Sequence, residues 1–125
     1  MSPRDAARAL AFGRIAIGAA CVVAPCTAGA MWIGADALRP GTTVFARALG
    51  ARDVLLGGML LHTIDRPEVG RRWLSATAAC DAVDFTAAAT VRDELPPLRG
   101  ALGMALAGGA AAAGFALSRA VAAQD

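Results

Sequence analysis

The chain has 125 residues, of which 57% are hydrophobic and 18% are charged, and its net charge is +2. An average soluble domain has about 45–50% apolar and about 25% charged residues, so this composition favours a membrane protein with one domain over residues 1–125. Every basic residue is an arginine, and the arginines are scattered along the chain. That scatter excludes a nucleic-acid partner, whose binding surface would gather basic residues on one face.

Four apolar segments follow one another along the chain, separated by three short polar breaks. Each segment is 19 to 25 residues long, and about 20 helical residues cross the hydrocarbon core of a bilayer. The breaks contain proline or charged residues, which end helices. The sequence therefore predicts an all-α fold, an antiparallel four-helix transmembrane bundle with helices at approximately 9–33, 44–64, 73–91 and 98–120.

The first segment predicts a helix with one small or polar face. The residues that recur there at helical spacing are Arg14, Gly18, Cys21 and Pro25. Pro25 predicts a kink, because proline lacks the N–H that a helix interior uses. A cleavable signal peptide ending at the small residues CTAGA is the competing interpretation. The apolar stretch is long for a signal peptide, which favours a transmembrane helix.

The second segment carries two adjacent charges, Arg52 and Asp53, inside an apolar run. On a helical wheel one arc of this segment is small or polar and the other is bulky. Small residues let membrane helices approach closely, so we expect the small arc to face the bundle. Asp53 and Arg47 lie on that arc and are predicted to point inward. Arg52 lies on the bulky arc and is predicted to reach lipid headgroups or another subunit.

The third segment is the least apolar of the four, because it contains Asp81 and Asp84, which share a face with Thr77 and Ala88. An aspartate at the centre of a spanning helix costs about 2.5–3.5 kcal/mol on insertion scales. We therefore expect this helix to insert with the help of its neighbours. The same aspartates leave a soluble, alanine-rich helical bundle as an alternative.

The fourth segment is rich in glycine, which predicts helix contacts beyond the monomer. Arginines outside the segments predict the orientation: six lie on the side of the N-terminus (Arg4, Arg8, Arg66, Arg71, Arg72 and Arg119) and three on the other (Arg39, Arg92 and Arg99). Because cytoplasmic loops carry excess Lys and Arg, we expect a multi-pass protein of the plasma (inner) membrane with both termini in the cytoplasm. Trp32 and Trp73 would mark the two membrane–water interfaces.

Charged residues near mid-depth define the predicted site. Asp53 lies about 14–16 Å from the ends of its segment, and Asp81 and Asp84 lie about 12–17 Å from Trp73, at about 1.5 Å per residue. Charges at that depth are costly unless they are paired, protonated or hydrated. The candidate site is a buried polar network, and its members are Arg14, Arg47, Arg52, Asp53, Asp81 and Asp84. It either fixes how the helices dock or serves as a binding or proton-responsive site.

No motif predicts catalysis or a metal centre. His62 is the only histidine, and one histidine cannot build a proton relay by itself. The cysteines Cys21, Cys26 and Cys80 form no CxxC pair and lie in apolar stretches, where cysteine behaves as a small hydrophobe. We therefore expect no catalytic residue, no metal and no cofactor, and the sequence favours a protein without enzymatic activity over an enzyme.

The chain resembles the small four-helix integral membrane proteins of unknown function that are common in actinobacteria. The most specific elements are RxLGxRD at 47–53 and DxxD at 81–84; Arg14, Gly18, Pro25, Gly57 and the stretch Arg71-Arg72-Trp73 accompany them. The resemblance implies a fold and a membrane location but no activity. Small multidrug exporters resemble the chain less well, because they use a glutamate in the first helix and the first apolar segment of this chain contains none.

These observations predict a binding or accessory module, embedded in the lipid bilayer as a homo-oligomer or as part of a larger membrane complex. The alternative is a small proton-coupled transporter or carrier that uses Asp53, Asp81 and Asp84. A membrane enzyme ranks lowest, because no nucleophile–base pair is present.

Overall fold

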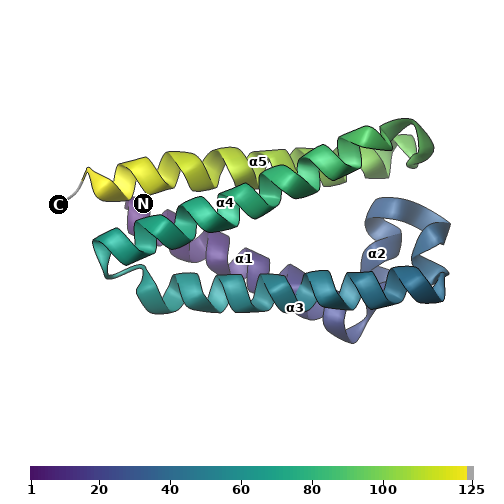
Figure 1. The fold of residues 1–125 in the computed structure, drawn as a ribbon, viewed down its shortest axis with the longest axis horizontal. Helices are drawn as coiled ribbons and strands as arrows, with labels where there is room; N and C mark the ends of the chain where they lie inside the picture. The colour runs from purple at the N-terminus through teal and green to yellow at the C-terminus, as the bar shows by residue number, and fades with distance from the viewer. Residues whose placement is uncertain (124–125) are drawn as a thin grey trace.

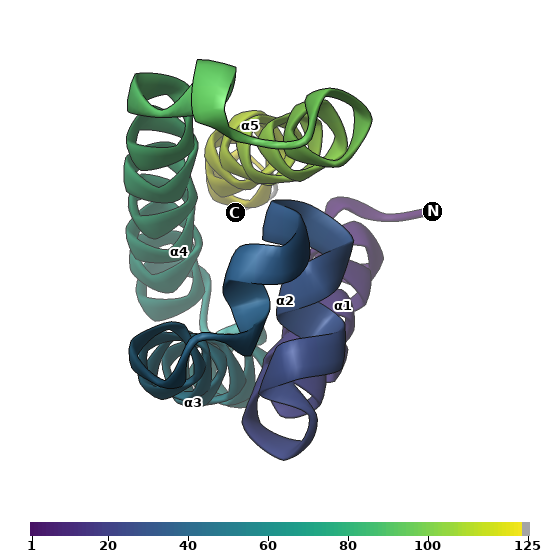
Figure 2. The same cartoon turned by 90° about the vertical axis from the view of Figure 1, so that its right-hand side faces the viewer.

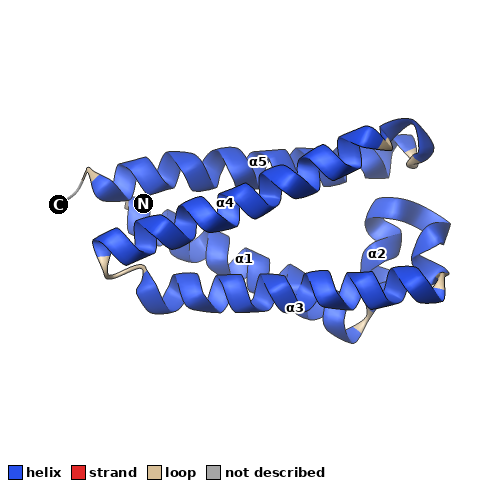
Figure 3. Cartoon of the chain, viewed as in Figure 1, coloured by secondary structure: helices blue, strands red, loops and turns tan. Residues whose placement is uncertain are grey.

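The computed structural model describes residues 1–123, and this part of the chain is helical apart from short connections (Figure 3). Five α-helices and two short 3-10 helices follow in the order α1 (Pro3–Val23), α2 (Pro25–Ile33), η1 (Gly34–Leu38), α3 (Pro40–Thr63), α4 (Pro67–Thr90), η2 (Arg92–Glu94) and α5 (Pro97–Ala122). The all-α prediction is confirmed, whereas the predicted number of helices is not.

A proline is the first residue of each of these α-helices. Proline suits this position because its φ is already helical and its missing N–H would have no helical partner there. At α1, Ser2 and Asp5 add a capping box, in which each side chain accepts a hydrogen bond from the other residue's backbone N–H. The long helices therefore start before the predicted 44, 73 and 98, and take in parts of the predicted breaks.

The first predicted helix, 9–33, is two helices, which corrects the expectation of a kink. α1 ends at Val23 and α2 begins at Pro25, with Ala24 between them at φ −131° and ψ 63°. The proline ring clashes with the carbonyl four residues earlier and offers no N–H, so a continuous helix is disfavoured there. α2 and η1 instead fold across one end of the bundle (Figure 2).

The long helices pack as two antiparallel pairs, α1 with α3 and α4 with α5, and the two pairs meet less extensively through α1–α5 and α3–α4. The N-terminus, the α3–α4 turn and the end of α5 lie together at what we call the terminal end (Figure 1). α2, η1 and η2 lie at the opposite end, which we call the α2 end.

Glycines bring α1 and α3 close together. A Cβ added at Gly18 would lie 2.6 Å from the Gly50 carbonyl oxygen, and one added at Gly57 would lie 2.6 Å from Ile15 Cγ1. Gly58, another small residue of α3, has no atom within 4 Å of such a Cβ. The face of α3 against α1 is therefore narrower than predicted.

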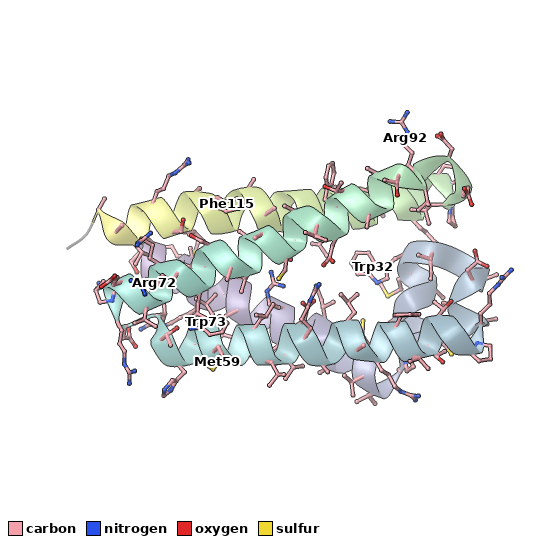
Figure 4. The ribbon with its side chains drawn as sticks, in the orientation of Figure 1. Trp32, Met59, Arg72, Trp73, Arg92 and Phe115 are labelled. Carbon is pink, nitrogen blue, oxygen red and sulfur yellow. The ribbon has the colours of Figure 1, made fainter. Side chains whose placement is uncertain are left out.

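Apolar side chains lie both inside and outside the bundle. A buried cluster at the terminal end contains Ala7, Ala11, Leu60, Ile64, Leu74 and Val121. Trp73 packs against this cluster, and Trp32 lies toward the α2 end beside Gly103 (Figure 4). Large exposed apolar side chains occur on every long helix, among them Phe12, Phe45, Leu55, Val83 and Leu102. The outer surface is thus apolar over much of its length.

Two helices, α1 and α5, are long and apolar enough to cross a membrane. Only 28% and 17% of their most apolar stretches are buried, whereas the core helix of a soluble protein is mostly buried. α3 and α4 do not meet the same criterion, so only two of the four predicted membrane helices have the length and composition that a span needs. α3 and α4 are also the helices that carry the mid-length aspartates.

Candidate functional site

Five of the six residues predicted for the polar network come together midway along the bundle. They form a continuous chain of ion pairs, the Arg/Asp network, in the order Asp81, Arg14, Asp53, Arg52 and Asp84. α1 contributes one residue, while α3 and α4 each contribute two. The sixth predicted residue, Arg47, lies outside it.

Arg14 is the buried centre of the network. Its Nη1 donates to Asp53 Oδ1 at 3.1 Å, and its Nη2 donates to Asp81 Oδ2. Only 5% of the Arg14 side chain is exposed. Its Nε is buried and has no hydrogen-bond partner within residues 1–123. Because α1 packs closely on α3 at Gly18, one turn away, the Arg14 guanidinium lies where α1, α3 and α4 meet.

Arg52 points into the bundle and joins α3 to α4, which corrects the prediction that it reaches outward. Its Nη1 lies 3.2 Å from Asp84 Oδ1 and its Nη2 lies 2.6 Å from Asp84 Oδ2, a two-bond arrangement that fixes the orientation of both groups. The same Nη2 lies 3.1 Å from Asp53 Oδ1. Asp53 therefore accepts hydrogen bonds from both arginines.

The network runs from the interior to the surface. The exposed fractions of its side chains are 9%, 5%, 16%, 32% and 33% for Asp81, Arg14, Asp53, Arg52 and Asp84. The Arg14–Asp81 pair is enclosed, whereas the Arg52–Asp84 pair is open between α3 and α4. Any group that exchanges with the network from outside would meet Arg52 and Asp84 first.

The network connects the two helix pairs. Arg14–Asp81 and Arg52–Asp84 both cross from the α1–α3 pair to α4. Removing one partner of a buried ion pair is strongly destabilising, because it leaves a charge without compensation. The arrangement can therefore fix the rotation and height of α4 against α1 and α3. Its three carboxylates share two guanidinium groups, so the network has one more acidic than basic side chain.

Arg47 caps a helix end instead of joining the network, which corrects its predicted role. Its Nε donates to the Val22 carbonyl oxygen at 3.3 Å, at the end of α1. Carbonyls in the last turn of a helix lack helical donors, and basic side chains satisfy them. Arg99 does the same at the end of α2, where its Nη1 lies 2.9 Å from the Ala30 oxygen.

The remaining candidates lie apart from the network. His62 is exposed in the last turn of α3, about 14 Å along the helix from Asp53. Cys21 is buried, and Cys26 and Cys80 are partly buried thiols. Within residues 1–123 no group of three or more His, Cys, Asp or Glu side chains is placed to hold a metal ion.

Two surface hollows lie elsewhere and contain no network residue. One of about 440 Å³ lies on α4 and is lined by Ala82, Val83, Thr86, Ala87 and Thr90. The other, of about 290 Å³, lies between α2 and α5 and is lined by Thr27, Ala30, Met31 and Arg99. Neither hollow gives a ligand access to the buried Arg14–Asp81 pair.

Comparison with known proteins assigns no family to this arrangement. No family model matches the chain, and no curated protein or solved structure is significantly similar to it.

Proposed function

We propose that the protein is an integral protein of the plasma membrane in which α1, α3, α4 and α5 all cross the bilayer. The observation that carries this proposal is a distribution of side chains opposite to that of a soluble protein. Large apolar groups cover the outside, while the mid-length aspartates are paired with arginines inside. Pairing removes most of the cost of placing Asp53, Asp81 and Asp84 at that depth. It accounts for the insertion of α3 and α4, which are too polar to span alone.

Helix lengths support the same proposal. α3, α4 and α5 have 24, 24 and 26 residues, which at about 1.5 Å per residue gives about 36–39 Å. The hydrocarbon core of a bilayer is about 30 Å thick. Each of these helices is long enough to cross it and extend into the headgroup layers.

Within the membrane, the protein serves as a binding or accessory module, assembled with itself or with a larger complex. Four glycines, Gly13, Gly41, Gly58 and Gly109, have no atom within 4 Å of an added Cβ. Glycine on the outside of a membrane helix lets another helix approach closely. In this proposal the Arg/Asp network holds the module in shape.

Fractionation tests the membrane location. Cells expressing the protein are lysed without detergent, and the membranes are washed with alkaline carbonate to strip peripheral proteins. We expect the protein to remain in the pellet and to be released by mild detergent, because its apolar outer surface needs lipid. Recovery in the supernatant after ultracentrifugation would refute the proposal and favour the soluble bundle.

A proton-coupled carrier is the second candidate function. The observation that favours it is the excess of one carboxylate in a network that is open at Arg52 and Asp84. Such a carboxylate exchanges a proton or a cation when the two helix pairs separate. In this case Asp84→Asn abolishes proton flux into vesicles while the folded protein is retained.

Under the docking role, Asp84→Asn instead lowers the thermal stability in detergent, because Arg52 loses the negative charge and one of the two acceptor oxygens of the Asp84 carboxylate. No flux exists to lose in this case. Asp93→Asn, which removes an exposed carboxylate at the α2 end, is the matched control and should leave both stability and flux unchanged. Wild-type vesicles that carry no proton flux across a pH gradient would exclude the carrier.

A further inference from the structure

Arginines differ between the two ends of the bundle in whether they have partners. At the α2 end, Arg39 pairs with Asp36, Arg92 lies beside Asp93, and Arg99 donates to a carbonyl of α2. At the terminal end, Arg8 pairs with Asp5 and Asp65, and Arg72 pairs with Glu68. Within residues 1–123, the arginines without an ion pair or hydrogen bond from the side chain are Arg66, Arg71 and Arg119. All three lie at the terminal end.

The same end has the excess of positive charge. Among residues 1–123, six arginines face three acids there, and the acids are Asp5, Asp65 and Glu68. Each of these acids already has an arginine partner. At the α2 end, the three arginines of the connections face three acids, Asp36, Asp93 and Glu94. Arg72 and Arg92, which Figure 4 labels, mark these two ends.

With the four long helices across a bilayer, as proposed above, the three unpaired arginines would lie at the depth of the lipid headgroups. Arg66 is in the turn between α3 and α4, Arg71 is four residues into α4, and Arg119 is three residues before the end of α5. At about 1.5 Å per residue, the latter two lie about 5–6 Å inside the helix ends. The polar layer on each side of a bilayer is about 5–8 Å thick. Their side chains therefore reach phosphate groups without leaving the bundle surface.

We propose that the terminal end binds the phosphate groups of anionic phospholipids through Arg66, Arg71 and Arg119. This inference rests on the proposed membrane location. A guanidinium group donates two parallel hydrogen bonds to a phosphate, and each basic residue near an anionic leaflet contributes about 1 kcal/mol. Among residues 1–123, every acid at this end already has an arginine partner. The α2 end, whose arginines are occupied, has no comparable preference.

Native mass spectrometry in mild detergent tests this, with the protein offered equal amounts of phosphatidylglycerol and phosphatidylcholine. The test variant is Arg66→Gln, Arg71→Gln and Arg119→Gln combined. The matched control is Arg39→Gln, Arg92→Gln and Arg99→Gln combined, which removes the same charge from the opposite end. We expect the wild type and the control to retain phosphatidylglycerol preferentially. The test variant should lose about fivefold of that preference for each arginine, the ratio equivalent to about 1 kcal/mol.

Equal retention of both lipids by the wild type, or an equal loss in the control, would overturn the proposal. Should the test variant fail to fold, salt provides the second measurement on the wild type. Raising the ionic strength from about 0.1 M to about 1 M shortens the Debye length from about 10 Å to about 3 Å. The preference for phosphatidylglycerol should therefore fall. A preference that does not change with salt would contradict binding by the arginines. Displacement of the lipid by an equal concentration of inorganic phosphate would show that free phosphate is the ligand and overturn the lipid assignment.

These outcomes are separate from the test of membrane location. A chain that stays in the aqueous fraction contradicts the proposed function itself. A chain that is embedded in the membrane but retains both lipids equally contradicts only the lipid assignment.

Discussion

Arg14 is the residue on which the network depends most. It donates to carboxylates from two different helices, Asp53 of α3 and Asp81 of α4, and it is almost fully buried. Asp53 keeps a second partner in Arg52, whereas Asp81 has no other ion pair within residues 1–123. Loss of Arg14 therefore leaves Asp81 as an enclosed charge with no cation beside it.

We expect Arg14→Gln to lower the free energy of unfolding in detergent by about 3–5 kcal/mol, the cost of removing one partner of a buried ion pair. Combining Arg14→Met with Asp81→Leu removes both charges and should recover part of that loss. Arg47→Gln is the control, because Arg47 is exposed and bonds only a carbonyl. Thermal unfolding measures all three. Equal effects of Arg14→Gln and Arg47→Gln would show that the buried pairs do not hold the helices.

At the scale of the elements, the α1–α3 contact depends on glycine at particular turns. Gly50 and Gly58 lie on the same helix, yet they meet different surroundings. A Cβ at Gly50 would lie 2.8 Å from Cys21 Cβ and closer still to the Gly18 carbonyl oxygen, whereas at Gly58 it meets open space. Backbone atoms cannot move aside as a flexible side chain does. Substitution by alanine should therefore change the stability of the protein in opposite directions at Gly50 and at Gly58.

Gly50→Ala should destabilise the protein by about 1–3 kcal/mol, the usual cost of overpacking. Gly58→Ala should stabilise it by up to about 1 kcal/mol, because alanine favours the helix more than glycine does. Melting temperatures in the same detergent compare the two directly. If Gly58→Ala is destabilising instead, its surface is occupied, and co-purification of a second copy or another membrane protein identifies what covers it.

On the scale of the whole molecule, the arrangement of the ends supports the proposed orientation in the membrane. The N-terminus, the α3–α4 turn and the end of α5 share one end, and that end carries six arginines against three at the α2 end. Arginine-rich ends remain in the cytoplasm. The predicted topology therefore agrees with the helix order, because an even number of crossings returns the chain to its starting side.

Reporter fusions measure that orientation. Green fluorescent protein joined to the C-terminus should fluoresce, and alkaline phosphatase joined there should be inactive, because phosphatase needs the oxidising side of the membrane. Phosphatase joined after Leu38, at the α2 end, should be active. The reverse pattern would place the arginine-rich end outside and contradict the orientation.

Local patterns in the sequence determined which parts of the chain are helical, where polar residues interrupt them, and which faces of the first and third segments turn inward. These features follow from helical periodicity and from the proline and charged residues of the breaks, which act within a few residues. That each α-helix starts at its proline, and so takes in part of a predicted break, came from the structure. Of the buried network, Arg14, Asp53, Asp81 and Asp84 could be predicted to point inward, because small or polar neighbours repeat at the same spacing.

Only the tertiary structure decided that Arg52 is inside and Arg47 outside, and that Pro25 separates two helices. An arginine carries its charge at the end of a long, flexible side chain, so its partner depends on the spacing and rotation of neighbouring helices. Arg52 points inward because Asp84 of α4 lies within its reach. Arg47 turns away because the break at Pro25 leaves a carbonyl of Val22 to cap. The directions of both side chains depend on contacts between helices, which the periodicity of a single helix does not predict.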